Sequence, residues 1–116
     1  MRATIVLIGL VLAACAASPI ELREQGIKST AELRLSPREA ANCAAKAIEN
    51  AGNSWTGYHV PSVRDGDAPE TVQLAIVGIL VADFSPNTNG SNVTIWEAGQ
   101  VFSSIRDRYT QAIRGC

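Results

Sequence analysis

Four side chains in this sequence are of the types that most often carry covalent or metal chemistry: three cysteines and one histidine. His59 is followed by Asp65 and Asp67, and an imidazole with carboxylates could transfer protons or bind a metal ion. These residues lack the spacing of a catalytic or metal-ligand motif, so we interpret them as part of a solvated turn. Cys43 also has no base beside it, because amide and alanine side chains flank it and His59 lies sixteen residues further on. The sequence therefore predicts a protein that is not an enzyme, with no metal site and no cofactor.

Cys15 ends an apolar leader. Arg2 is followed by the nearly uninterrupted apolar stretch Ile5–Leu12, which is too short to cross a bilayer core of ~30 Å that needs about 20 apolar residues. The four residues Leu12-Ala13-Ala14-Cys15 resemble the lipobox of bacterial lipoproteins, in which the cysteine is acylated and the segment before it is removed. We expect residues 1–14 to be a signal peptide and Cys15 to be the lipidation site. A buried N-terminal helix or strand that ends in cysteine is the alternative.

The lipobox resemblance implies a location. The two or three acyl chains of a lipoprotein cysteine make a lasting membrane anchor, since each buried methylene contributes about 0.8 kcal/mol. In lipoproteins at large, Asp directly after the acylated cysteine signals retention in the inner membrane, and Ala16 occupies that position here. The resemblance thus implies the periplasmic face of the outer membrane, with the membrane itself as one partner.

If Cys15 carries lipid, Cys43 and Cys116 remain. Two leftover cysteines in an exported chain are more often paired than reactive. We expect a Cys43–Cys116 disulfide, which would close a loop of about 74 residues and stabilise the fold by roughly 4 kcal/mol in the chain-entropy model. A free, nucleophilic Cys43 is the alternative.

Charge and length exclude other classes. The 10 basic and 11 acidic side chains nearly balance and are scattered along the 116 residues. Nucleic-acid binding requires clustered Lys and Arg, so nucleic acid is not an expected partner. The length fits one domain with a small core.

The chain after the lipobox begins with a predicted tether. Residues 15–28 show no sustained period and contain Pro19 and Gly26, and the segment would reach on the order of 45 Å when fully extended. Residues 29–116 then form the predicted single domain.

The first predicted elements of this domain are a strand and a helix. Polar and apolar residues alternate over Thr30–Leu35, which is the period of a half-buried strand. Ser36-Pro37 and Glu39 form a helix start, because Ser can cap, Pro suits the first helical position and Glu can complete a capping box. The helix ends at Asn50-Ala51-Gly52. Its predicted contact face is rich in alanine and consists of Ala40, Cys43, Ala44, Ala47 and Ile48.

The middle of the chain predicts three strands. Trp55, Tyr58 and Val60 suggest one strand, with a polar turn over Arg64–Pro69 after it. The apolar run Thr71–Phe84 is long for one strand, so we divide it near Val77-Gly78 into two strands joined by a tight turn. A single bent strand with a bulge at Gly78 is the alternative.

The last predicted elements are a turn, a strand and a helix. Pro86–Ser91 is rich in turn residues, and Asn92–Trp96 alternates like a returning strand. Val101–Arg114 has helical spacing. Its predicted buried stripe is Val101, Ile105, Tyr109, Ala112 and Ile113.

Together these elements predict an α+β fold. It has an antiparallel sheet of four to five strands with two helices packed on one face, and the Cys43–Cys116 disulfide links these two helices to each other. The chain resembles a group of small proteobacterial lipoproteins of unassigned function. The likeness is carried by the lipobox, the helix start from Ser36-Pro37 to Cys43, the hairpin Ala82–Thr94, and Cys116 at the end of the last helix. The resemblance supports the fold and the disulfide and implies no ligand.

Some polar and aromatic residues are candidates for a binding surface. Trp55, Tyr58 and His59 precede charged turn residues, a mixture that suits recognition if the rings are exposed. Trp55, Tyr58 and Trp96 would otherwise belong to the core. Asp83 lies in an apolar stretch, where a carboxylate usually sits at a sheet edge or bonds to a turn amide.

The expected function is therefore binding. We expect a membrane-anchored periplasmic lipoprotein, non-catalytic, that binds another envelope protein or a cell-wall component through an exposed part of the sheet or the loop Ser54–Asp67. The alternative is a carrier or sensor of a small apolar ligand in the periplasm, which would need a cavity above ~300 Å³.

Overall fold

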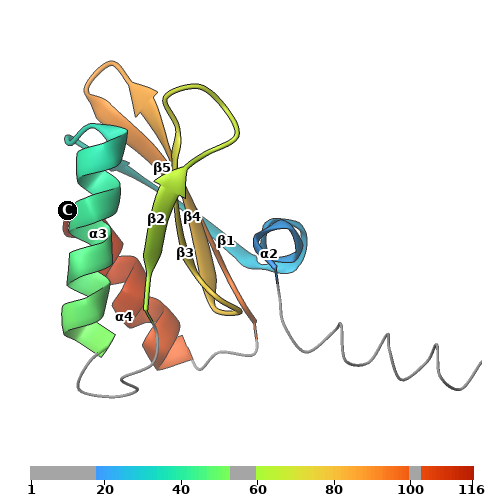
Figure 1. The fold of residues 1–116 in the computed structure, drawn as a ribbon. Helices are drawn as coiled ribbons and strands as arrows, with labels where there is room; N and C mark the ends of the chain where they lie inside the picture. Colours follow the sequence, from blue (N-terminus) through green and yellow to red (C-terminus); the bar gives the residue numbers. More distant parts are fainter. Residues whose placement is uncertain (1–17, 53–59, 100–102) are drawn as a thin grey trace, which may run out of the picture.

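A five-stranded antiparallel sheet forms the centre of the computed structural model, which describes residues 18–52, 60–99 and 103–116. The strands lie side by side in the order β1-β5-β4-β3-β2. Their bounds are β1 Ile27–Leu33, β2 Ser62–Asp65, β3 Val72–Ile76, β4 Leu80–Asn87 and β5 Gly90–Glu97. This confirms the predicted α+β class, with β4 as the central strand (Figure 1).

Helices cover both faces of the sheet. The helices α3 (Pro37–Gly52) and α4 (Ser103–Arg114) lie on one face, and α2 (Pro19–Gln25) lies on the other (Figure 1). The predicted pair of helices on one face is thus present, and the helix on the opposite face was not predicted.

The main core fills the space between the sheet and the α3–α4 pair. On the sheet side, alternate residues of the central strands are buried because successive side chains of a strand point to opposite faces. On the helix side, Ala40, Ala44 and Ile48 of α3 are completely buried, as predicted for the alanine-rich face. Tyr109 and Ile113 of α4 complete the layer. The small alanine side chains let α3 pack directly against the sheet.

A disulfide links the two helices of this face. Cys43 in α3 and Cys116, just after α4, are joined with their Cα atoms 6.0 Å apart. The predicted pairing is confirmed, and the α3–α4 layer is closed covalently.

The division of the long apolar run is also confirmed. The strands β3 and β4 are separate and connected by the turn 77–79, where the N–H of Ile79 donates to the carbonyl of Ile76 at 3.0 Å. Gly78 has a φ of 74°, a conformation that glycine adopts without steric cost. The alternative of one bent strand with a bulge is therefore wrong.

The next hairpin is tighter than predicted. Residues Pro86 and Ser91, assigned to a turn, belong to β4 and β5, and only residues 88–89 connect the two strands. Pro86 is tolerated in a strand because β3 begins only at Val72, opposite Phe84, so no residue of β3 lies beside Pro86 to accept a hydrogen bond from a backbone N–H.

The largest correction concerns the predicted tether. From Ser18 on it is folded, since α2 occupies Pro19–Gln25 and β1 begins at Ile27. The Ser18 side chain accepts a hydrogen bond from the N–H of Glu21, with Pro19 in the first turn, and Leu22 is buried against Val81 and Ala98. Burial of this apolar side chain holds a helix that is too short to be stable alone. The folded domain therefore includes Ser18 and does not begin at residue 29.

The strand predicted around Trp55, Tyr58 and Val60 falls mostly on residues 53–59, which the structure does not describe, and Val60 itself is not in a strand. The strand β2 runs over Ser62–Asp65, so part of the predicted polar turn is strand. Its partner β3 sets this register by pairing Ser62 with Ala75. The residues Trp55 and Tyr58, like Val101 at the predicted start of the last helix, lie outside the described residues.

Candidate functional site

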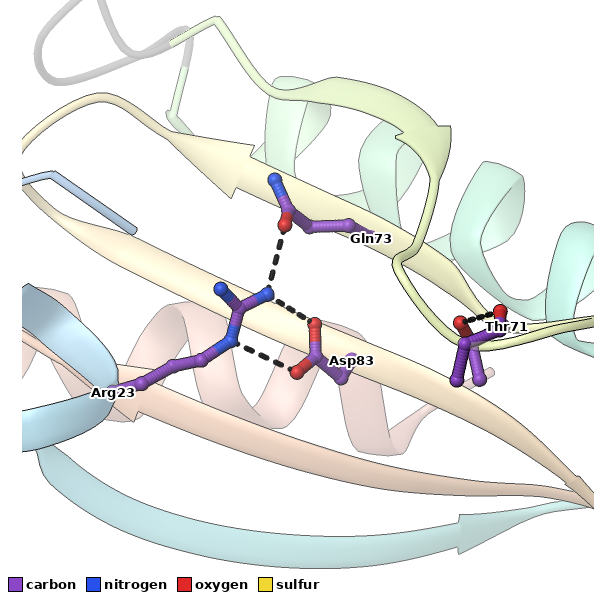
Figure 2. Close-up of polar contacts among 5 residues, drawn as sticks. Arg23, Thr71, Gln73 and Asp83 are labelled. Carbon is purple, nitrogen blue, oxygen red and sulfur yellow. Dashed lines mark hydrogen bonds and ion pairs between the residues drawn. The ribbon is translucent and has the colours of Figure 1, made fainter. Parts of the chain in front are cut away.

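A polar cluster lies on the sheet face that α2 covers. Arg23 of α2 donates from Nε to Asp83 Oδ2 at 3.0 Å and from Nη2 to Asp83 Oδ1 at 2.7 Å. The same Nη2 donates to Gln73 Oε1 at 2.8 Å. Figure 2 shows how Arg23 reaches from the helix to these side chains on two neighbouring strands, whose register places Gln73 directly opposite Asp83. A two-pronged Arg–carboxylate contact of this kind fixes orientation as well as charge.

Trp96 extends the cluster to a third strand. The guanidinium carbon of Arg23 lies 5.8 Å from the centre of the Trp96 ring, within the range of a cation–π contact. Trp96 is half-buried on this outer face and packs against the small apolar cluster under α2. The hydrogen bonds that Arg23 donates to Asp83 raise the pKa of the guanidinium, and partial burial opposes that shift. The negative charges of Asp83 and Asp67 raise the pKa further. Arg23 is therefore a permanent cation fixed to β3, β4 and β5.

A pocket of about 240 Å³ opens beside this cluster. It is lined by Arg23 and Asp83 and by residues of the β2–β3 loop: Gly66, Asp67, Ala68 and Thr71. The loop is ordered by its own hydrogen bonds. Thr71 donates from Oγ1 and from its N–H to the carbonyl of Ala68, at 2.6 and 3.2 Å, and the N–H of Gly66 donates to the carbonyl of Thr71 at 2.9 Å (Figure 2 labels Thr71). One side of the pocket is thus formed by the hydrogen-bonded Arg23–Asp83 pair and the other by a loop with its own internal hydrogen bonds.

The chemistry of this pocket is polar recognition. Its side chains supply a guanidinium donor from Arg23, a hydroxyl oxygen of Thr71 that can accept, and two carboxylates, from Asp67 and Asp83. Such a mixture can hold a polar group of a partner by several directed hydrogen bonds. We therefore take the pocket and the loop 66–71 as the candidate binding surface.

A second polar cluster is buried on the opposite face. Glu97, at the end of β5, accepts a hydrogen bond at Oε1 from Thr110 Oγ1 of α4. The other oxygen of Glu97 and Nε of Arg106 are buried without a hydrogen-bond partner among the described residues. Burial raises the pKa of the Glu97 carboxyl, while the Thr110 bond and the charge of Arg106 lower it and the charge of Asp107 raises it. This cluster affects stability and opens into none of the pockets described here.

Asp83 corrects one sequence prediction. Neither the expected sheet edge nor a bond to a turn amide explains it, because Asp83 lies on the central strand and its partner is Arg23. The sequence did not single out Arg23 or Gln73. The Ser18-Pro19-x-Glu21 start of α2 was the available signal, since it repeats the pattern recognised at Ser36.

The other predicted site residues divide between described and undescribed parts of the chain. Asp65 and Asp67 lie on and after β2, and Asp65 pairs with Arg38 at the start of α3. The predicted lipidation site Cys15 and the predicted surface of Trp55, Tyr58 and His59 lie outside the described residues. Of the predicted binding segment Ser54–Asp67, the structure therefore describes the part from Val60 on, and its last two residues line the pocket.

Comparisons with known proteins add no relative. The chain matches no protein-family model, and neither a curated protein nor a solved structure is significantly similar to it. Within residues 18–52, 60–99 and 103–116, none of the helices combines the length and apolar character needed to cross a bilayer. The same part of the chain contains no group of three or more His, Cys, Asp or Glu residues that could hold a metal ion.

Proposed function

We propose that this protein is a lipid-anchored envelope protein that binds another envelope component with its folded domain. The observation that carries the proposal is how the three cysteines divide. Cys43 and Cys116 are joined to each other, and disulfides persist mainly in oxidising compartments such as the bacterial periplasm. Cys15, the remaining cysteine, ends the apolar leader in the lipobox-like sequence, so acylation is the chemistry that fits it.

The anchored domain would act by binding, without catalysis. Its partner, an envelope protein or a cell-wall component, would contact the loop 66–71 and the pocket beside Arg23 and Asp83. This contact surface is supported by the guanidinium of Arg23 and the exposed carboxylate of Asp67, both of which line the pocket. The proposed location is the periplasmic face of the outer membrane. The resemblance to small proteobacterial lipoproteins supports this proposal.

The alternative of an apolar-ligand carrier has less support. The most apolar pocket among the described residues, between α2 and the β3–β4 turn, measures about 210 Å³, and two larger hollows of about 600 and 710 Å³ have mixed polar and apolar linings. Dedicated pockets for small molecules are typically ~300 Å³ or larger. The alanine face of α3, completely buried against the sheet, also favours tight packing over a ligand space.

The anchoring is tested by Cys15→Ser. We expect the variant to lose labelling by radioactive palmitate and to leave the membrane fraction, whereas a Cys43→Ala/Cys116→Ala variant keeps both properties. A Cys15→Ser protein that still labels and sediments with membranes contradicts the anchor.

The binding surface is tested by crosslinking in intact cells. A photoreactive amino acid at Asp67 should capture a partner, and the same amino acid at Gln111, exposed on α4, should not. A triple variant tests the surface predicted from the sequence. It carries the photoreactive amino acid at position 67 and alanine in place of Trp55, Tyr58 and His59. Loss of capture from position 67 in this folded triple variant would show that the segment 55–59 takes part in the site. No capture from position 67 in the parent background would contradict the site proposed at the loop 66–71.

A further inference from the structure

The exposed apolar side chains of this domain gather at one end of the sheet. Val77, in the β3–β4 turn, is 85% exposed, and Val60 is 69% exposed. Val60 lies two residues before Ser62, which pairs with Ala75, so both valines lie beyond the same end of the β2–β3 ladder.

The two remaining large exposed hydrophobic residues of the described chain lie at this end too. Ile27 is 50% exposed and begins β1. It pairs with Glu97, and Glu97 pairs with Leu80, the first residue of β4 after the turn. Ile20, which is 66% exposed, is in the first turn of α2.

An apolar groove joins the helix to the turn. It has a volume of about 210 Å³ and lies between Ser18, Pro19 and Leu22 of the α2 start and residues 75–78 with Leu80. The valine of the turn, Val77, forms part of this groove. The four exposed residues and the groove are named here the apolar end.

The opposite end of the sheet is polar. It is formed by the β2–β3 loop and the β4–β5 turn, where Asp67, Glu70 and Asn89 are exposed. The two ends of the strands therefore differ in polarity, and the candidate binding pocket lies toward the polar end because residues of the β2–β3 loop line it. Figure 1 shows this loop at the opposite end of the sheet from the β3–β4 turn.

The sequence limits how far the predicted anchor can be from the apolar end. Ser18, which lines the groove, follows Cys15 by three residues. Three residues span at most about 11 Å even when fully extended, whereas the tether predicted from the sequence would have allowed about four times that reach. An acylated Cys15 would therefore hold the apolar end within reach of the lipid headgroups.

We propose that the apolar end rests on the bilayer that holds the Cys15 anchor, with Ile20 and Val77 inserted among the lipids. This inference rests on the proposed lipid anchor. Apolar side chains gain by leaving water, and a lipid surface accepts them without a matching protein shape. Glu21, Glu24 and Lys28 are exposed on and after α2 with both signs of charge, so the contact depends on apolar burial and is insensitive to salt. In this orientation the polar end of the domain points away from the membrane, and the pocket beside Arg23 is open to a partner.

The test uses the acylated protein purified from membranes and reconstituted in vesicles of phosphatidylethanolamine and phosphatidylglycerol. Val77→Trp and the control Asn89→Trp are compared, after subtraction of the parent signal, in vesicles with brominated acyl chains. We expect at least a twofold stronger quenching at position 77 than at 89, unchanged in 0.5 M salt (about three times physiological ionic strength). Ile20→Asp added to Val77→Trp should reduce the quenching at 77.

The outcomes separate this inference from the proposed anchor. Intact mass shows whether Cys15 carries acyl chains, and flotation shows whether the protein is on the vesicles. Protein without acyl chains refutes the anchor and with it this inference. Acylated, floating protein with equal quenching at 77 and 89 refutes this inference alone. So does a Trp at 77 that is shielded from both brominated lipid and aqueous acrylamide, which would mean that a second copy of the chain covers the apolar end.

Discussion

At the scale of single residues, Arg23 has the most consequence for this fold. Its guanidinium contacts Asp83 on β4, Gln73 on β3 and the ring of Trp96 on β5. One side chain thereby fixes the short helix α2 to three strands. Because Arg23 and Asp83 are both partly exposed, water screens the pair and its contribution lies between those of surface and buried ion pairs.

A double-mutant cycle measures this contribution. With Arg23→Met and Asp83→Asn, we expect a coupling free energy of about 1 kcal/mol from urea unfolding. Either single change already removes the two-pronged charged hydrogen bond, so the double variant should lose less stability than the sum of the two single variants. The exposed pair Arg38–Asp65 is the matched control and should couple by less than about 0.5 kcal/mol. Equal coupling in the two pairs would contradict the role assigned to Arg23.

Glu97 predicts a dependence of stability on pH. Burial raises the pKa of its carboxyl above the ordinary glutamate value of about 4.3. The folded state then binds the proton more tightly than the unfolded state, so the contribution of Glu97 to stability is most favourable below pH ~4.3 and declines as the pH rises through the folded pKa.

Replacement of this carboxyl tests the sign. We expect Glu97→Gln to remove that decline, so its free energy of unfolding should gain relative to the parent protein between pH 4 and pH 7. The exposed control Glu32→Gln on β1 should follow the parent curve. A Glu97→Gln protein that parallels the parent across this range would show that the carboxyl is not perturbed.

At the scale of elements, the two helices that begin with Ser-Pro behave differently. Both starts have the pattern Ser-Pro-x-Glu, at Ser18 and at Ser36. The sequence predicted only the second, because sixteen residues of amphipathic pattern follow it, whereas α2 has seven residues and one buried side chain, Leu22. A helix this short depends on its tertiary contacts, and periodicity alone could not reveal it.

Two glycines with positive φ provide a test of the turns. Gly78 has open space around the position of an added Cβ, so Gly78→Ala should cost only about 1 kcal/mol of backbone strain. An added Cβ at Gly90 would lie 2.3 Å from the carbonyl oxygen of Leu33 and 2.6 Å from the carbonyl carbon of Arg34. Gly90→Ala should therefore cost roughly 2 kcal/mol more than Gly78→Ala in thermal or urea unfolding. Equal costs would mean that β1 does not approach the hairpin this closely.

At the scale of the whole molecule, one covalent link and one apolar end organise the domain. The disulfide joins positions 73 residues apart in sequence and ties the last helix to α3. A core with small alanine contacts in a chain of this size gains much from such a link, because the unfolded chain loses conformational freedom.

Loss of this link should be costly. Cys43→Ala/Cys116→Ala should lower the free energy of unfolding by roughly 4 kcal/mol and the melting temperature by at least several degrees. Thiol titration of the native, non-reduced protein should detect neither cysteine, and two readily titrated thiols would contradict the pairing and restore Cys43 as a candidate nucleophile.

The sequence by itself determined the elements whose local pattern is complete. Alternation over Thr30–Leu35 predicted the second half of β1, missed its start at Ile27 and ran two residues past its end at Leu33, and the Ser36-Pro37 start predicted α3. The turn at Gly78 and the Cys43–Cys116 pairing also followed from residue type and from counting. These properties depend on backbone preference and on the face that each residue takes within one element, which neighbours in sequence specify.

Only the tertiary structure decided how separate elements meet. Arg23 and Asp83 are 60 positions apart, and nothing local to either residue specifies their contact. The same holds for Ile20, Ile27, Val60 and Val77, each unremarkable in its own segment, which strand register brings to one end of the sheet. Register is set by the packing of all strands at once, so the candidate pocket and the apolar end arise from the assembled fold and not from any single stretch of sequence.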